Sequence, residues 1–203
     1  MNPPKKNLNR ETILDTALLM IDETGGIKEV TLRAIAQRMG CAHTNLYNYF
    51  SSLEEIYWEC VARILLLMIE DMGREDPDIP DPEEKLFGAL LRMMDFSFDH
   101  LGWHRLVWLE PSKGSPPPQV IPALHQAPLF LAKAISEAGK GTLNESRVSQ
   151  LLDILFAYLY GEINMWITRR NSVADRQKCK DNAYVNIRLI FRLIRDDAKT
   201  AEV

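Results

Sequence analysis

Apolar side chains recur every three or four residues along almost the whole chain, and this spacing restricts the possible folds more than any other feature of the sequence. Such a period places the apolar residues on one face of a helix, as in the run from Ile13 to Ile21. No segment shows the alternation of β-branched and polar residues that is typical of strands. The sequence therefore predicts an all-α fold.

Capping residues divide the N-terminal part into short helices. The side chains of Asn9 and Thr31 can accept a hydrogen bond from the first turn of a helix, and Gly25 and Gly40 can adopt the left-handed conformation that ends one. These residues predict one helix from Asn9 to Gly25 and a second from Thr31 to Gly40. A shorter helix is expected between residues 41 and 50.

A longer helix is predicted after residue 50. Ser52 and Glu55 form an S-x-x-E capping box, which predicts a linking helix over about residues 52–72. The segment GREDPDIPDPEE is the clearest break in the chain, and Asp81 with Pro82 then begins the next helix. Further helices are expected over residues 82–102, 122–138, 144–170 and 173–196.

The charge distribution is uneven. The chain has 203 residues, enough to bury a substantial core, and a net charge of −4. Between Val30 and Leu53, however, it contains Arg33 and Arg38 and no acidic residue. Electrostatic interactions are screened beyond about 8 Å at physiological salt, so a partner responds to the charge near it and not to the net charge of the chain. This local excess of positive charge therefore suits an anionic partner.

The cysteines and the termini give no sign of export. The three cysteines (Cys41, Cys60 and Cys179) are too few and too scattered for a disulfide framework or a zinc site. The N-terminus lacks the apolar core of a signal peptide, and charged and amide residues interrupt the most apolar run, residues 151–167. We expect a cytoplasmic protein with no membrane span, metal or cofactor.

Residues 31–50 have the pattern of a helix-turn-helix, in which two helices meet at Gly40. The side chains expected between the helices are Ile35, Met39, Cys41, Leu46 and Tyr49. The outward side chains are short, neutral and rich in hydrogen-bonding groups, which suits the reading of base edges, while threonine and tyrosine hydroxyls can hold phosphates. The predicted DNA-contacting residues are Thr31, Arg33, Ala42, His43, Thr44, Asn45, Tyr47, Asn48 and Tyr49.

Other interpretations of residues 31–50 remain open. The two helices could form a hairpin that only packs, or a helix-turn-helix that no longer binds DNA because its positive charge is small. Lys5, Lys6 and Arg10 could form an arm that contacts DNA or could belong to a solvated tail. With so few basic residues, we expect DNA affinity to depend modestly on salt.

The segment VTLRAIAQRMGCAHTNLYNYFSSLEEI resembles the DNA-binding helices of the tetracycline-repressor (TetR) family of transcriptional regulators. The resemblance covers about 50 residues and depends on Val30-Thr31, Ile35-Ala36, Met39-Gly40 and the LYNYF run before a serine-capped helix. Two positions depart from the family pattern. Leu53 replaces a frequent lysine, which removes one phosphate contact, and Cys41-Ala42 replaces Val-Ser.

The resemblance implies a helix-turn-helix DNA-binding domain over residues 1–55 and a larger helical domain for ligand sensing and dimerisation over residues 56–203. It also implies a repressor that is released from a palindromic operator in double-stranded DNA. Release would follow when a small apolar effector binds the C-terminal domain and the linking helix moves the DNA-binding heads.

A homodimer is expected, because one short reading helix contacts few base pairs and two half-sites lie about 34 Å apart or at a multiple of that spacing. Residues 151–167 are apolar on nearly every side, and the last helix has a wide apolar stripe. The predicted interface residues are Leu155, Leu159, Ile163, Tyr184, Ile187, Phe191 and Ile194. An ordinary intramolecular core is the alternative.

Aromatic, methionine and a few polar side chains of the C-terminal two thirds could form an effector pocket. The predicted ligand-contacting residues are Met93, Trp103, His104, Trp108, His125, Tyr158, Glu162 and Trp166. For each of them, core packing or solvation is the alternative.

Enzymatic and metal-binding functions have little support. His100 and His104 have the i, i+4 spacing of metal ligands, but no third ligand motif accompanies them. Cys179, between two lysines, could be a redox-sensing thiolate or a solvated bystander. Since no nucleophile or phosphate-binding motif is found, we expect no enzyme. An all-α enzyme and a helical protein–protein adaptor remain the alternatives.

Overall fold

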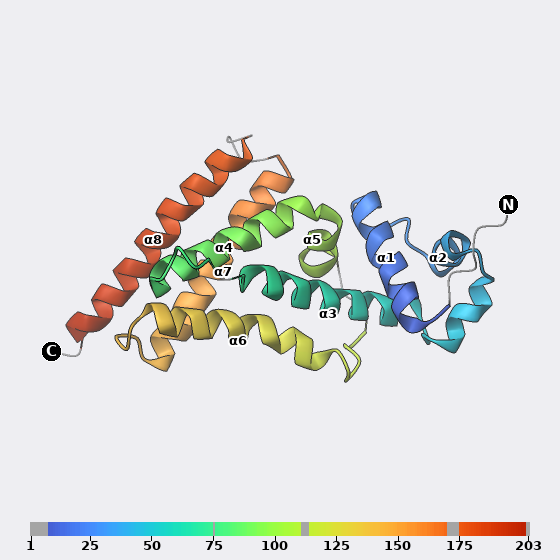
Figure 1. Ribbon diagram of the computed structural model, residues 1–203, viewed down its shortest axis with the longest axis horizontal. Helices are drawn as coiled ribbons and strands as arrows, with labels where there is room; N and C mark the ends of the chain where they lie inside the picture. The colour runs from blue at the N-terminus through green and yellow to red at the C-terminus, as the bar shows by residue number, and fades with distance from the viewer. Residues whose placement is uncertain (1–7, 75, 111–113, 170–174, 202–203) are drawn as a thin grey trace. The chain divides into compact units, whose positions relative to one another are not determined.

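The computed structural model describes residues 8–74, 76–110, 114–169 and 175–201 (Figure 1). Lys5 and Lys6 lie outside these ranges. The described residues form helices and loops without any strand, which confirms the all-α prediction. The elements are α1 (Arg10–Thr24), α2 (Leu32–Met39), the 3₁₀ helix η1 (His43–Asn48), α3 (Leu53–Met72), α4 (Pro82–Asp99), α5 (Leu101–Trp108), α6 (Ile121–Ala138), α7 (Glu145–Ile167) and α8 (Arg176–Ala201).

The chain forms two compact units. The first unit contains residues 1–67 and 100–124, and the second contains residues 68–99 and 125–203. This division differs from the predicted boundary after residue 55, because most of α3 and the whole of α5 belong to the first unit. Within the described ranges, no helix has the length and apolar character needed to cross a bilayer.

The predicted capping residues begin and end the first helices. The Asn9 side chain accepts a hydrogen bond from the Thr12 amide at 2.8 Å, and the Thr31 hydroxyl accepts one from the Ala34 amide at 3.1 Å. Gly25 and Gly40 end α1 and α2 at φ angles of 69° and 70°. Left-handed backbone of this kind strains residues that carry a Cβ, so both helices end where glycine occurs.

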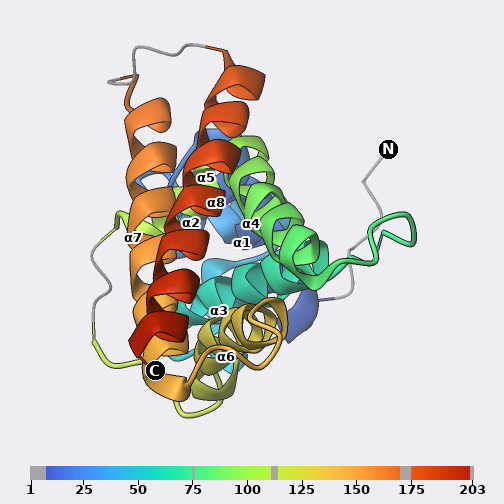
Figure 2. The ribbon, with the colours of Figure 1, turned by 90° about the vertical axis from the view of Figure 1, so that its left-hand side faces the viewer.

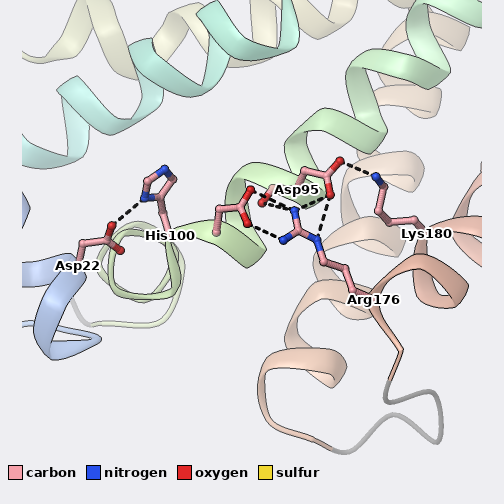
Figure 3. A network of polar contacts seen from close by, with 6 residues as sticks. Asp22, Asp95, His100, Arg176 and Lys180 are labelled. Carbon is pink, nitrogen blue, oxygen red and sulfur yellow. Dashed lines mark hydrogen bonds and ion pairs between the residues drawn. The ribbon is translucent and has the colours of Figure 1, made fainter.

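Helix α4 ends earlier than predicted. It was expected to continue to Gly102, but α4 stops at Asp99 and His100 leaves the helical conformation with φ −124° and ψ 64°. The His100 Nδ1 atom lies 2.7 Å from a carboxylate oxygen of Asp22 in α1 (Figure 3). The chain therefore turns toward α1 before α5 begins.

Helix α5 packs closely on α1 within the first unit. A Cβ atom on Gly102 would lie 2.0 Å from the Ile21 carbonyl oxygen, so only glycine allows this approach. The Trp103 indole donates to the Leu18 carbonyl oxygen at 2.9 Å. These contacts are the physical reason why α5 joins the N-terminal residues, a long-range contact that helical periodicity cannot reveal.

The second unit is built around α4, α7 and α8, and α7 lies beside α8 (Figure 2). Its core comes from side chains at four-residue intervals, which share one helix face. On α7 the buried residues are Leu151, Leu155, Leu159 and Ile163, and on α8 they are Cys179, Ala183, Ile187 and Phe191. The rings of Phe87 and Phe191 meet edge to face with centroids 5.7 Å apart.

Ion pairs join α4 to α8 near both ends of α8. Near the start of α8, Arg176 lies 2.6 Å from Asp95, and Lys180 lies 2.5 Å from the other oxygen of the same carboxylate (Figure 3). Near the other end, Arg192 and Arg195 pair with the buried Glu83 at 2.8 and 2.5 Å. Since Glu83 begins α4 and Asp95 is near its end, these pairs fix α4 and α8 antiparallel.

The residues considered for metal binding and redox sensing lie in other environments. Cys179 is buried in the α7–α8 core, and burial raises the pKa of its thiol, assisted by the charge of Glu162. It is therefore not solvated, and burial disfavours its thiolate form. Among the described residues, no group of three histidine, cysteine, aspartate or glutamate side chains could hold a metal ion.

Candidate nucleic-acid interface

The turn between α2 and η1 is built by backbone hydrogen bonds around Gly40. Its amide donates to the Gln37 carbonyl oxygen at 3.1 Å, and the Cys41 amide donates to the Ala36 carbonyl oxygen at 3.0 Å. Ala42 then adopts an extended conformation and the chain enters η1. The second helix of the predicted pair is thus a 3₁₀ helix of six residues, shorter and tighter than an α-helix.

Burial divides this segment into an inner and an outer face. Ile35, Met39 and Leu46 are buried as predicted, and Cys41 and Tyr49 are half-buried. The predicted outward residues are all exposed: Ala42, His43, Thr44, Asn45, Tyr47 and Asn48. Thr31 and Arg33, at the start of α2, are exposed as well. We call these eight residues the reading face.

The polar groups of η1 are available to a partner. Within the part of the chain that the structure describes, the side chains of His43, Thr44, Asn45, Tyr47 and Asn48 form no hydrogen bond or ion pair with another residue. Tyr47 is the most prominent large side chain among them, with 54% of its surface exposed. The η1 part of the reading face therefore offers donors and acceptors that no described residue uses.

Tyr49 differs from the rest of the predicted set. Its ring is half-buried, and its hydroxyl donates to the Leu8 carbonyl oxygen at 2.8 Å. The hydroxyl has one proton, and this bond uses it. The hydroxyl therefore has no proton left to donate to a phosphate oxygen. In this structure Tyr49 holds the N-terminal segment against the end of η1.

The two arginines near the turn have different environments. Arg38 forms a double hydrogen bond with Glu23 at 2.7 and 2.8 Å, which raises the pKa of its guanidinium and neutralises its charge. Arg33 is exposed and, among the described residues, has no carboxylate partner. The positive charge available to phosphate on α2 is therefore that of Arg33.

Arg10 makes contacts within the first unit that the sequence did not indicate. Its guanidinium donates to the Tyr49 carbonyl oxygen and to both Glu55 and Glu59, and it lies 4.1 Å from the centre of the Phe50 ring. Hydrogen bonding to Glu59 is the main reason that the Arg10 pKa is raised. The residue considered for a DNA-contacting arm thus fastens α1 and the end of η1 to α3.

The start of α3 completes this arrangement. The Ser52 hydroxyl accepts from the Glu55 amide at 3.1 Å, as in the predicted capping box. The Glu55 carboxylate, however, accepts from the amide and hydroxyl of Ser51, each at 2.7 Å. Burial alone would raise the pKa of Glu55, but hydrogen bonds from Arg10 and Ser51 outweigh it and lower the pKa.

The eight predicted ligand-contacting residues are divided between the two units. Trp103, His104 and Trp108 lie on α5 in the first unit, and the second unit contains Met93, His125, Tyr158, Glu162 and Trp166. Trp166 packs on Phe98 of its own unit, with ring centroids 4.3 Å apart. His125 is exposed. The structure does not bring the eight residues together in one compact unit.

The predicted dimer residues require a correction. Leu155, Leu159, Ile163, Ile187 and Phe191 are at most 2% exposed, because they form the core between α4, α7 and α8 of one chain. Tyr184 and Ile194 are half-buried at its edge. The outer face of α8 instead exposes Val185, Leu189 and Leu193 at 63%, 56% and 62%. Periodicity identified the apolar helix correctly but not which of its faces is covered.

Comparisons with known proteins support the fold. No protein-family model and no curated protein matches the chain. A protein of unknown function from Rhodococcus sp. RHA1 is similar in structure, with a TM-score of 0.77, 15% identity and coverage of 95% of this chain and 98% of that one. A tetR-family transcriptional regulator from Streptomyces coelicolor has a TM-score of 0.71 at 14% identity, with 94% of this chain and 88% of that chain covered.

BioQ, solved with its natural double-stranded DNA operator, is a further similar structure. Its TM-score is 0.61 at 19% identity, and the similarity covers 95% of this chain and 98% of BioQ. The chain therefore has the fold of the TetR-family regulators, with an N-terminal helix-turn-helix followed by a helical C-terminal part. At these identities the similarity establishes the fold alone.

Proposed function

We propose that the protein is a sequence-specific transcriptional regulator of the TetR family, which binds double-stranded DNA as a homodimer and has no catalytic role. The observation that carries this proposal is the reading face, which is exposed and free of acidic residues, and whose hydrogen-bonding side chains on η1 are not occupied by any described residue. Such groups distinguish base pairs in the major groove. The similarity to BioQ, which was solved on its operator, adds support.

Residues of the reading face divide into two roles in this proposal. Asn45, His43 and Thr44 contact base edges, because amide, imidazole and hydroxyl groups match the donors and acceptors of the major groove. Tyr47, Thr31 and Arg33 contact phosphates and set the position of η1 on the duplex. A change to the first group alters sequence preference, whereas a change to the second weakens binding to all sequences.

Selection of bound duplexes from a random library at about 100 mM salt tests the proposal. The wild-type protein is expected to enrich a palindromic motif, and Tyr47→Ala is expected to enrich none. Asn45→Ala should retain binding and lose about 1–3 kcal/mol of discrimination at one base pair in each half-site. Lys133→Ala, on the exposed surface of α6, is the control and should select the wild-type motif. Enrichment by Tyr47→Ala equal to that of the wild type would place the reading face elsewhere.

The outer face of α8 is the surface we propose for the dimer. Val185, Leu189 and Leu193 form an exposed stripe at four-residue spacing, flanked by Arg188 and Arg192 in a groove. A stripe of large apolar side chains on a helix is costly to leave in water and is typical of an association surface. In a symmetric dimer the same stripe from each copy meets at a two-fold axis.

The repressor activity and its release by a small apolar effector also belong to the proposal. The second unit contains a cavity of about 290 Å³ between the end of α3, α4 and α6, with Leu86, Ala89 and Phe130 in its lining. This volume is close to the lower limit for small-molecule sites. Titration of the selected duplex complex with compounds that bind the second unit tests release, since a true effector dissociates the DNA.

A further inference from the structure

Besides the cavity described in the second unit, the first unit contains a cavity of about 380 Å³ at the base of the helix-turn-helix. Its walls come from the α1–α2 loop, one face of α3 and the end of α5. None of the eight ligand-contacting residues predicted from the sequence lines it. The cavity is therefore a candidate site that the proposed function does not use.

The walls of this cavity are mainly apolar and aromatic. Val30, Val61 and Leu106 are buried in it, and Tyr57 and Trp58 add two rings from successive positions of α3. The Tyr57 hydroxyl donates to the Val30 carbonyl oxygen at 2.5 Å, which fixes that ring against the loop. A volume of this size suits a small organic molecule with an apolar body.

Two carboxylates, Glu54 and Glu110, belong to the same lining. Neither forms a hydrogen bond or ion pair with any residue that the structure describes. Burial raises the pKa of Tyr57 to about 12, and the negative charges of Glu54 and Glu110 contribute to that rise. Both charges therefore act on the cavity wall, and neither is paired with a cation of the described part of the chain.

The balance of charge favours a cation as the occupant. Lys28 also lines the cavity, but it is exposed, and a solvated ammonium group gains little from a surface contact. The aromatic faces of Tyr57 and Trp58 attract cations as well. An anionic occupant would have one solvated partner and two repelling carboxylates.

We infer that this cavity binds a small molecule with an aromatic or branched apolar body and one ammonium group, which pairs with Glu54 and Glu110. Thr31, the N-cap of α2 and a proposed phosphate contact, lines the same cavity. An occupant would change the position of the Thr31 hydroxyl and so weaken its contact with DNA. This regulatory consequence rests on the proposed function, but the binding itself does not.

Calorimetric titration of the full chain without DNA tests the site. Three probes share one aromatic body and differ in charge: 1-naphthylmethylammonium, neutral 1-naphthylmethanol and anionic 1-naphthoate. The ammonium probe is expected to bind about tenfold more tightly than the alcohol, because a hydrogen bond between charged groups is stronger than a neutral one. The naphthoate should bind most weakly.

The double variant Glu54→Gln/Glu110→Gln should bind the ammonium probe no more tightly than the alcohol, with its affinity for the alcohol unchanged. Glu29→Gln, an exposed residue outside the cavity, is the matched control and should keep the tenfold preference. The inference is overturned if no probe binds up to about 1 mM, if naphthoate binds best, or if the double variant keeps the preference for the ammonium probe.

A second measurement separates this inference from the proposed function. If the library selection yields a duplex, the ammonium probe should weaken its binding to the wild type but not to the double variant. Ammonium-selective binding without any selected duplex would leave the site in place and refute the DNA-binding proposal. A selected duplex without ammonium-selective binding would support the DNA-binding proposal and refute the cavity site.

Discussion

Replacing Arg10 with methionine should loosen the end of η1 without removing any residue of the reading face. The apolar stem is largely retained, and three kinds of contact are lost. The hydrogen bond to the Tyr49 carbonyl oxygen is worth about 1 kcal/mol. The contact with the Phe50 ring at 4.1 Å adds about 0.5–1 kcal/mol.

The two ion pairs contribute less than their geometry suggests. Because 41% of the Arg10 side chain is exposed, solvent screens its pairs with Glu55 and Glu59, and each is worth about 0.5 kcal/mol. The Arg10→Met variant should therefore lower the free energy of local opening by about 2.5–3 kcal/mol in total.

Amide hydrogen exchange at Phe50 measures this opening, because its amide donates to the Leu46 carbonyl oxygen at 3.0 Å within the fastened segment. Exchange should accelerate by about 70- to 160-fold in Arg10→Met. Arg38→Met is the matched control, since Arg38 also has a double hydrogen bond to a carboxylate but no ring or carbonyl contact. Acceleration by the same factor in both variants would refute the reasoning.

Three further outcomes follow from the structure. Gly40→Ala should destabilise the first unit by about 1 kcal/mol, because its φ is +70°, whereas Gly161→Ala in the interior of α7 should not; urea unfolding compares them. The folded-state pKa of Glu55 is lowered, so the stability that its carboxylate contributes is fully present above the unfolded pKa and is lost as the pH falls through the folded pKa. In acid unfolding, Glu55→Gln should therefore lose less stability below about pH 4 than the wild type. Leu189→Glu should weaken the dimer by about a hundredfold in sedimentation equilibrium, whereas Leu129→Glu, at a leucine of α6 that is even more exposed, should not. Equal dimerisation by both variants would exclude the α8 stripe.

Local signals in the sequence predicted most helix boundaries in the N-terminal part. Asn9, Thr31 and Gly40 act within four residues of their own position, so their roles follow from residue type alone. The outward face of η1 was predicted for a similar reason, because short polar residues without acids are unusual on a solvated helix. That η1 is a 3₁₀ helix was not predictable from this pattern.

Contacts between distant segments escaped prediction. Gly102 looked like a helix end, whereas its role is to let α5 approach the Ile21 carbonyl oxygen. Leu155 and Phe191 had the correct apolar period, but a period cannot tell an intramolecular neighbour from a second copy of the chain. Arg10 appeared to be a free basic residue because its carboxylate partners lie 45 and 49 positions away.

The 3₁₀ geometry of η1 arranges the reading face in straight rows. With three residues per turn, side chains three apart are eclipsed, so Thr44 lies in line with Tyr47 and Asn45 in line with Asn48, about 6 Å along the axis. An α-helix would instead spiral these positions around its surface. Substitutions of two residues in one row should therefore be non-additive, while changes in different rows should act independently, so specificity would be altered one row at a time.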